Sequence, residues 1–535
     1  MLKVQGLLFA VLLLCSAVAG QLSTASTAAP RIAVVGAGVG GACSAHFLRE
    51  LLGPDAAIHV FDKGPVGGRT QTLTYDGLVL EAGASIVFEQ NLYFRDLADA
   101  LGLERVDPSL SSSDDLFSIF DGQHMVFQQS AWAPITLARM LWRYGLNYWR
   151  FKAGPQGMLK RFLTIYDYQA NGTAFETPEQ LLRSTGLYRP TQQTMAALLQ
   201  EVLGSSGPAL RFGSELAAAV NRVNYNQGNA LNALAGMVSM LPTVDSRVFA
   251  IKGGNRRLPE ELLKNASALV HARAVQTVAK SGMGYTLKLA EKEPGVNQAA
   301  LDTFDAIILA TPLELSNLSI EGIALPHLPP RKYQSTITTF VRGVLDPAYF
   351  GEAHPIKGSV FVSEAAATPF SVIAPKKSYD DGSTLYKFFS ESELSPLVLS
   401  KIFTNFTVVA SHPWFAYPKF HPPEQFAPFK LADGLFYGNA WENAASAMEV
   451  ACIGGRNSAL LVLQHLQKAR GFLIFQGGTR HHAAASRPAH DSRHPTQYPQ
   501  QPPQQPGQYP NVYKPDGSAP ASYPPVGKGD QPSPV

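Results

Sequence analysis

Three glycines near the start of the chain have the spacing of a turn that binds a dinucleotide. Gly36, Gly38 and Gly41 follow an apolar, β-branched run over residues 31–35 and open a segment with helical periodicity. Such glycines let the chain turn tightly and bring free amide groups close to a pyrophosphate, whose charge the helix N-terminus favours. Asp62 ends the next predicted strand, 21 residues after Gly41, where a carboxylate accepts hydrogen bonds from an adenosine ribose. The spacing therefore predicts dinucleotide binding, and the carboxylate disfavours the 2′-phosphate of NADP.

The elements that must position this motif form one βαβ unit over residues 31–62, followed by a longer mixed chain. An apolar run at residues 306–310 predicts a second buried parallel strand. Residues 105–245 are rich in helical patterns, and residues 335–428 combine strand-like runs with many prolines. A last helix is expected over residues 444–468.

The composition indicates a large folded core and a separate tail. The chain has 535 residues, of which 45% are hydrophobic and 16% are charged, so much of it should be buried. Its net charge is +3 with no block of Lys or Arg, so a nucleic-acid partner is not expected. Beyond residue 477, Pro, Gln, Tyr, Ser, Gly and His dominate, a composition that buries too little apolar area to fold.

The N-terminus has the features of a secretory signal. Lys3 precedes an apolar run at residues 7–14, and Ala17-Val18-Ala19 offers small residues for cleavage, so residues 1–19 are predicted to be removed. A membrane anchor is the alternative, but the run is too short to span a bilayer, and no later stretch is long enough. Four Asn-x-Ser/Thr sequences are candidates for glycosylation: Asn171, Asn265, Asn317 and Asn405.

Cysteine is scarce. Cys15 lies in the expected signal, which leaves Cys43 and Cys452 and excludes a disulfide framework. A single bridge between these two is one interpretation. Two buried free thiols that act as small hydrophobes are the favoured one.

Two further motifs distinguish the cofactor. Gly67-Gly68-Arg69-Thr70 comes soon after Asp62, and Glu81-Ala82-Gly83-Ala84 follows. This arrangement resembles the flavin-containing amine oxidase superfamily, and further matches lie at Ala274-Val275, at residues 308–312 and at Met448-Glu449. The resemblance implies FAD rather than NAD. The sequence shows no metal-binding cluster, so no metal is expected. It implies these cofactor-binding residues: Gly36, Ala37, Gly38, Gly41, Asp62, Lys63, Gly68, Arg69, Gly83, Ala84, Val275, Met448 and Glu449.

Within that superfamily the chain is similar to one family. Residues 437–449 read YGNAWENAASAME, where amine oxidases typically carry G-E-x-[ST]. This string looks like the prenylcysteine oxidases, also called prenylcysteine or farnesylcysteine lyases. Shorter stretches agree, at residues 142–145, 222–227, 253–255, 338–343 and 412–418. The resemblance covers residues 31–467; it omits the tail, and Arg256-Arg257 is more basic than the family pattern.

The resemblance implies a defined reaction. The substrate is a cysteine whose sulfur carries a farnesyl or geranylgeranyl group, left by degradation of prenylated proteins. FAD takes hydride from the prenyl carbon next to sulfur, water adds, and the products are free cysteine, a prenyl aldehyde and hydrogen peroxide formed from oxygen. The alternatives are a secreted amine or amino-acid oxidase, or a catalytically silent flavoprotein whose tail recruits partners.

No side chain is assigned to catalysis. Glu442 and His421 could assist the addition of water and Arg222 could meet the substrate carboxylate, but structural roles are favoured for all three. The helical stretch at residues 135–149 could form an apolar wall for the isoprenoid, with Leu137, Leu141, Tyr144 and Tyr148 on one face. An ordinary core helix is favoured over that wall, and a helix in peripheral contact with membranes is a third interpretation.

The resemblance also implies the architecture of the folded part and the compartment, and the composition predicts the tail. We expect an α/β protein in which a Rossmann-type FAD-binding domain is assembled from discontinuous segments and an α+β substrate domain is inserted, followed by a disordered tail. The FAD-binding segments are residues 31–105, 246–312 and 431–472, the substrate domain comprises residues 106–245 and 313–430, and the tail is residues 473–535. The expected location is the lysosome or vacuole, with secretion as the alternative.

Overall fold

The chain is described here from a computed structural model. It divides into two units, Met1–Ile474 and Phe475–Val535, and every described residue belongs to the first. The described residues are 29–108, 116–130, 132, 134–136, 138–139, 148–244, 247–290, 303–363 and 368–470, without the side chains of 148–153, 244 and 470. The expected signal, the tail and most of the stretch at residues 135–149 lie outside this part of the chain.

A six-stranded sheet carries the predicted dinucleotide motif. Its strands run in the order β10-β2-β1-β13-β21-β20, all parallel except β20 at one edge. The predicted central strands are buried on both faces, as parallel strands covered by helices require. The six strands are β10 (Leu269–Ala272), β2 (Ala57–Asp62), β1 (Arg31–Val35), β13 (Ala306–Leu309), β21 (Leu435–Tyr437) and β20 (Lys430–Ala432).

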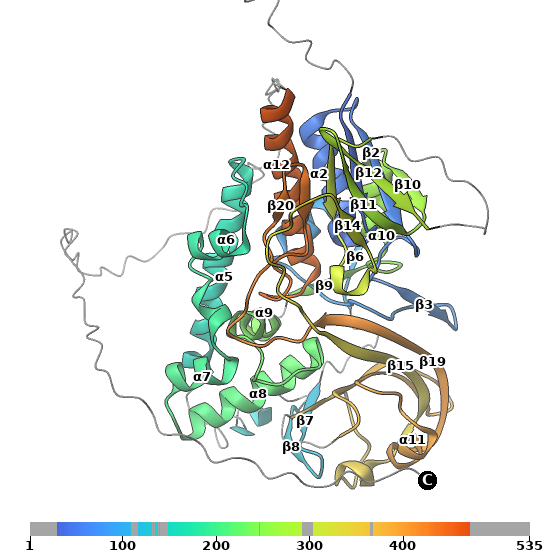
Figure 1. Cartoon of the computed structure of the whole chain (residues 1–535). Helices are drawn as coiled ribbons and strands as arrows, with labels where there is room; N and C mark the ends of the chain where they lie inside the picture. The colour runs from blue at the N-terminus through green and yellow to red at the C-terminus, as the bar shows by residue number, and fades with distance from the viewer. Residues whose placement is uncertain are drawn as a thin grey trace, which may run out of the picture. The chain divides into compact units, whose positions relative to one another are not determined.

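Two helices from opposite ends of the chain cover one side of this sheet. Helix α2 (Val39–Leu52) connects β1 to β2, and α12 (Met448–Arg470) packs along it, as Figure 1 shows in its upper part. The last helix begins at Met448 rather than at the predicted residue 444, because residues 440–444 form turns in which Ala440 and Ala444 bond back to residues 437 and 441. Helix α10 (Arg257–Asn265) also contacts α2.

A second large sheet has seven strands and lies in the lower right of Figure 1. Its order is β19-β15-β18-β17-β16-β7-β8, and only β16 and β7 pair in parallel. The strands are β19 (Phe403–Pro418), β15 (Tyr333–Leu345), β18 (Thr384–Ser390), β17 (Val372–Ser378), β16 (Ser359–Val362), β7 (Phe117–Phe120) and β8 (Met125–Gln128). The strands β7 and β8 fall within the region whose patterns predicted mainly helices. They pair with each other, and β7 joins the large sheet through β16, which lies more than 200 residues further along the chain.

Helices α5 to α9 make up most of the remaining middle segment, on the left of Figure 1. Thr177 starts α6 with a capping box, in which its side chain accepts a hydrogen bond from the amide of Gln180. The other helices are α3 (Leu92–Ala100), α5 (Tyr148–Ala170), α6 (Pro178–Ser184), α7 (Met195–Leu203), α8 (Pro208–Tyr225), α9 (Ala233–Val244) and α11 (Pro396–Ile402).

The described part of the chain also contains three small sheets. The strands β3 (Thr72–Tyr75) and β4 (Leu78–Glu81) form a hairpin. The other two sheets comprise β12 (Gly284–Leu289), β11 (Val275–Ser281) and β14 (Ser319–Glu321), and β5 (Val87–Phe88), β9 (Val248–Ile251) and β6 (Arg105–Val106). The predicted α/β fold with a Rossmann-type sheet built from distant segments is therefore confirmed.

Candidate cofactor site

The turn between β1 and α2 is shaped by its glycines. Gly36 has a φ of +113°, which favours glycine, and a Cβ on Gly41 would lie 1.8 Å from the carbonyl oxygen of Gly36. Gly38 differs, because a Cβ there would have no neighbour nearer than 3.8 Å, at the Cα of Gly68. The space above Gly38 is therefore open, as the approach of a phosphate to the backbone requires.

The second glycine segment faces the first. The amide of Gly67 donates to the carbonyl of Ala37 at 2.9 Å, and Gly38 and Gly67 form an isolated parallel bridge. Gly68 is exposed and has a φ of +54°. The two motifs predicted from sequence thus form one backbone cradle at the N-terminus of α2, where the first helical amides lack intrahelical partners. This cradle fits a dinucleotide.

Asp62 stands at the end of β2, as the sequence predicts, and has an additional role. Its Oδ2 accepts from the amide of Ala37 at 2.7 Å and its Oδ1 accepts from the amide of Gly64 at 2.8 Å. The carboxylate is therefore oriented by the turn itself, and its remaining lone pairs can still accept from ribose hydroxyls. Lys63, beside it, is exposed.

Arg69 lies in a charged group beside the cradle. Its guanidinium contacts Glu442 at 2.5 Å and donates to the carbonyl of Ala416 at 2.7 Å. The Arg69 side chain is 34% exposed whereas that of Glu442 is 7% exposed, so the arginine has an open side and the carboxylate does not. Burial alone would raise the pKa of Glu442, but the charges of Arg69 and Arg331 outweigh it and hold that pKa below its ordinary value. Glu442 is thus a fixed anion that keeps Arg69 charged and in place.

Further polar contacts hold Glu442. The hydroxyl of Tyr333 donates to it at 2.9 Å and that of Ser446 at 3.1 Å. Arg331, whose charge also lowers the pKa of Glu442, is itself held by Glu314, to which it donates at 2.7 Å, and by a contact with the hydroxyl of Tyr437.

The segment Glu81-Ala82-Gly83-Ala84 packs directly against the Arg69 motif. A Cβ on Gly83 would lie 2.0 Å from the carbonyl oxygen of Arg69, and the amide of Ala84 donates to that same oxygen at 3.0 Å. Glu81 accepts from the amide of Asn255 at 2.6 Å. The two motifs that favoured FAD over NAD therefore lie side by side.

Sequence reasoning missed a buried lysine next to this segment. Lys387, on β18, donates to Ser85 at 2.6 Å and is 5% exposed. Burial lowers its pKa, the positive charge of Lys376 lowers it further, and Glu81 acts in the opposite direction. Burial likewise raises the pKa of Glu81. The sequence held a signal, since Lys387 is a single cation among the apolar residues 385–389.

The last predicted cofactor residues lie at the start of α12. Glu449 is buried, and its carboxylate accepts from the amides of Tyr93 at 2.8 Å and Phe94 at 2.9 Å and from the hydroxyl of Tyr166 at 2.6 Å. Burial raises its pKa to about 7. This side chain therefore caps helix α3. Val275 is buried at the start of β11.

Two side chains considered for catalysis lie elsewhere in the inserted segments. The backbone amide of His421 donates to Glu424 at 3.0 Å, and Arg222 lies on α8. Glu424 also accepts from Asn232 and Asn443, both at 3.1 Å, and burial raises its pKa to about 7.

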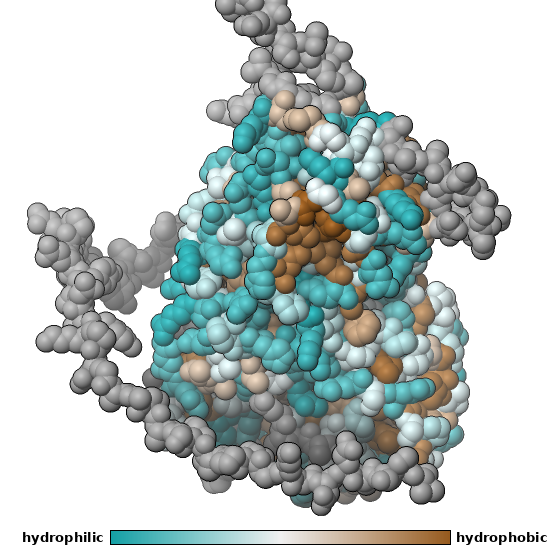
Figure 2. Space-filling model, viewed as in Figure 1, coloured by the Kyte–Doolittle hydropathy of each residue, from teal (hydrophilic) through white to brown (hydrophobic). Residues whose placement is uncertain are grey.

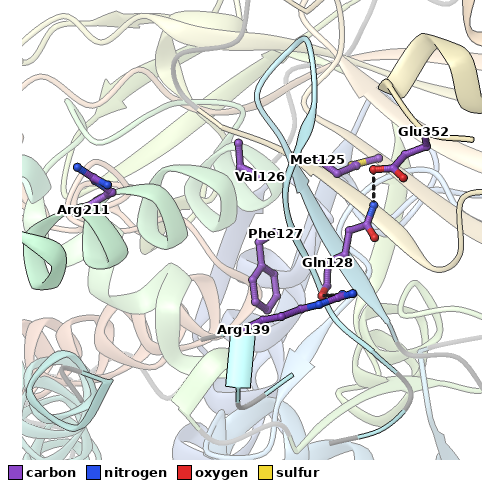
Figure 3. Close-up of a pocket in the computed structure, with 7 residues that line it drawn as sticks. All are labelled: Met125, Val126, Phe127, Gln128, Arg139, Arg211 and Glu352. Atoms are coloured by element: carbon purple, nitrogen blue, oxygen red, sulfur yellow. Dashed lines mark hydrogen bonds between the residues drawn. The ribbon is translucent and has the colours of Figure 1, made fainter. Parts of the chain in front are cut away.

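A surface pocket of about 520 Å³ opens beside β8, at the edge of the seven-stranded sheet opposite β19 (Figure 3). Gln128 donates to Glu352 at 2.6 Å across it, and Arg139 donates to the carbonyl of Gln128 at 2.8 Å. The lining is rich in polar groups, so it lacks the apolar walls that an isoprenoid needs. The lining residues are Met125, Val126, Phe127, Gln128, Arg139, Arg211 and Glu352.

Among the described residues, no group of three or more His, Cys, Asp or Glu side chains is arranged to hold a metal ion. The four asparagines of the glycosylation sequences, in contrast, are all exposed: Asn171, Asn265, Asn317 and Asn405.

Comparison with known proteins gives two family matches. Residues 127–471 match the prenylcysteine lyase family, and residues 34–101 match a family of NAD(P)-binding Rossmann-like domains. Prenylcysteine oxidase 1 of Mus musculus is 33% identical over 479 residues, which cover 84% of this chain and 92% of that protein. The human protein of that name is 32% identical over 484 residues, covering 86% and 94%, and human prenylcysteine oxidase 1-like is 31% identical over 452, covering 81% and 90%.

Solved structures support the fold. Cyclohexylamine oxidase from Brevibacterium oxydans superposes with a TM-score of 0.53 at 16% identity, covering 82% of this chain and 100% of that one. A triple mutant of putrescine oxidase gives 0.52 at 16% identity, covering 80% and 98%. At this identity the likeness concerns the fold alone.

Proposed function

Because the chain belongs to the prenylcysteine lyase family, we propose that it is an FAD-dependent oxidase that cleaves the thioether of S-prenyl-L-cysteine. The substrate is a farnesyl- or geranylgeranylcysteine. With oxygen and water it yields free cysteine, a prenyl aldehyde and hydrogen peroxide. The observation that carries the proposal is the family match together with the cradle in which Gly38 and Gly68 face each other.

When bound, FAD supplies the two-electron acceptor for the hydride that leaves the prenyl carbon next to sulfur. The chain's own residues bind and orient. The N-terminus of α2 would hold the pyrophosphate, Asp62 would accept hydrogen bonds from the ribose, and Arg69, fixed by Glu442, would lie near the cofactor.

We further propose Lys387 as the group that accepts the proton released when water adds to the oxidised thioether. Burial favours its neutral amine, which is the form that can take a proton. Its bond to Ser85 places it next to Ala84 of the cofactor motif. Glu442 is less suited to this step because its carboxylate is already occupied by Arg69 and Tyr333.

The experiment that tests the activity compares substrates. Purified protein is supplied with farnesylcysteine, geranylgeranylcysteine, putrescine, cyclohexylamine and L-amino acids in air, and peroxide and aldehyde are measured. The proposal expects peroxide and prenyl aldehyde in equal amounts with the prenylated cysteines alone. Turnover of amines or amino acids in place of prenylcysteines would contradict it.

We propose that the protein works in the secretory pathway, in a lysosome or vacuole. The exposure of all four candidate asparagines supports this, because a glycan needs a surface position. Digestion of the native protein with an N-glycosidase should lower its mass, and replacement of each asparagine by glutamine should identify the occupied sites. An unchanged mass in protein made through the secretory pathway would contradict glycosylation.

No helix in the described part of the chain is long and apolar enough to cross a membrane. A peripheral contact is a proposal supported by the apolar region that Figure 2 shows near the position of β14 and β20. In that part of the chain, Leu318, Ile320 and Ile323 are partly exposed. Flotation with liposomes tests the contact, and failure to float with them would contradict it.

A further inference from the structure

The two cysteines of the described chain meet inside the protein. Cys43, in α2, and Cys452, in α12, are 409 residues apart in sequence, and each is 0% exposed. Their sulfur atoms lie 2.6 Å apart, although both are free thiols in the structure. This separation is inside the contact distance of two unbonded sulfur atoms and close to the bond length of about 2.0 Å.

The packing of the two helices explains why such short side chains can meet. A Cβ on Gly455 would lie 2.8 Å from the carbonyl oxygen of Gly40 and 3.0 Å from the amide nitrogen of Ser44. Gly40 in turn lies against Ala451, so residue numbers rise together along both helices and they run parallel. The lack of a side chain on Gly455 lets the two backbones approach closely, and Cys43 and Cys452 are enclosed at this contact.

We infer that Cys43 and Cys452 form a disulfide in the mature protein, in place of the two free thiols that composition favours. Each thiol loses its hydrogen as the sulfur–sulfur bond forms. The two electrons and two protons pass to a disulfide oxidant of the compartment, which is reduced to two thiols. Both sulfur atoms are enclosed between the helices, so the finished bond is protected from reductants.

The position of this bond gives it a consequence for the cofactor. Cys43 lies near the start of α2, the helix whose first amides form the cradle. Cys452 lies near the start of α12, which begins at Met448. Because the helices are parallel, the bond fixes the spacing between the first turns of α2 and α12, and α2 is the helix whose N-terminus forms the cradle. The bond itself is independent of the proposed catalysis, and only its effect on FAD retention rests on the proposed function.

Peptide mapping of the native full-length protein tests the bond directly. Tryptic cleavage should release Cys43 in residues 32–49 and Cys452 in residues 431–456. After alkylation in denaturant without reductant, we expect these peptides as one linked species, two hydrogen atoms lighter than their sum, which separates on reduction. Recovery of both peptides singly and alkylated would overturn the inference, whatever the enzyme activity.

Variants then test the consequence. The wild type should melt several degrees lower, and lose FAD faster on gel filtration, after reduction in denaturant and refolding under reductant. The double variant C43S/C452S should melt at that lower temperature with or without reductant. S458A is the matched control, because the buried Ser458 hydroxyl on α12 donates to the carbonyl of Gly454 in its own helix, and it should keep the full effect of reduction. A wild type whose melting and FAD retention do not respond to reduction would contradict the stapling role, while the peptide map still decides the bond.

Discussion

Among single residues, the site is distinguished by charged groups in a buried environment. Arg69 and Glu442 compensate each other, whereas the cluster of Lys387, Lys376 and Glu81 has two amines for one carboxylate. Burying two amines and one carboxylate costs free energy, and burial lowers the pKa of both amines, which favours their neutral forms. A neutral buried amine can accept a proton, which is the role proposed for Lys387.

This leads to a prediction for Lys387→Met. The variant should bind FAD but lose turnover of farnesylcysteine by on the order of 100-fold, the usual loss when a general base is removed. In the wild type the rate should rise with pH through the lowered pKa of Lys387, because only the neutral amine accepts a proton. The pH profile of turnover number checks this.

Lys387→Arg is the matched variant, since it keeps the positive charge but cannot become neutral. It should be as slow as Lys387→Met and lack the rise with pH. Full turnover in either variant, with an unchanged pH profile, would remove Lys387 from the mechanism.

At the scale of elements, the turn between β1 and α2 separates folding from ligand binding. In Gly38→Ala the new methyl group meets no protein atom within 3.8 Å, so the protein should fold and melt almost normally but lose FAD. In Gly41→Ala the methyl group would lie 1.8 Å from a carbonyl oxygen, so the turn cannot form and both folding and FAD binding should fail. FAD absorbance and thermal melting of each variant measure the two effects.

Gly40→Ala is the control on the same helix. Its methyl group would lie 3.5 Å from the carbonyl oxygen of Ala451, an ordinary contact, so it should keep both FAD and stability. If Gly38→Ala retained FAD with normal affinity, the cradle would not be the pyrophosphate site.

The elements also show what the sequence could predict and what it could not. Gly36, Gly38 and Asp62 were predictable, because the motif is local and its chemistry depends on spacing within one βαβ unit. Lys387 was not predicted, because its meaning depends on β18 pairing into a sheet that lies beside residues 81–85. Nor was the cap of α3 by Glu449, because its partners are about 350 residues away in sequence.

At the scale of the whole molecule, buried carboxyls make stability depend on pH. Burial raises the pKa of Glu424 and of Glu449 to about 7, above the ordinary value of 4.5. Between these pH values the folded protein keeps the protons and the unfolded chain releases them, so rising pH favours unfolding. Each group should cost on the order of 3 kcal/mol of stability between pH 4.5 and 7. The protein should therefore melt at a higher temperature at pH 5 than at pH 7.

Melting curves across this pH range, on the wild type and on Glu424→Gln and Glu449→Gln, check the prediction. Each variant should weaken the dependence on pH, whereas Glu321→Gln, at an exposed position, should not. A wild type that is more stable at pH 7 than at pH 5 would show that these carboxyls are not held protonated.

The whole-molecule claim is that one chain holds FAD and a prenylated cysteine so that electrons pass between them. The most direct measurement adds farnesylcysteine to the protein in the absence of oxygen and records the absorbance of the bound flavin at about 450 nm. The account predicts that the absorbance bleaches with one equivalent of substrate, that farnesal appears in equal amount, and that air restores the colour. Bound flavin that stays oxidised in the presence of farnesylcysteine would contradict the central claim.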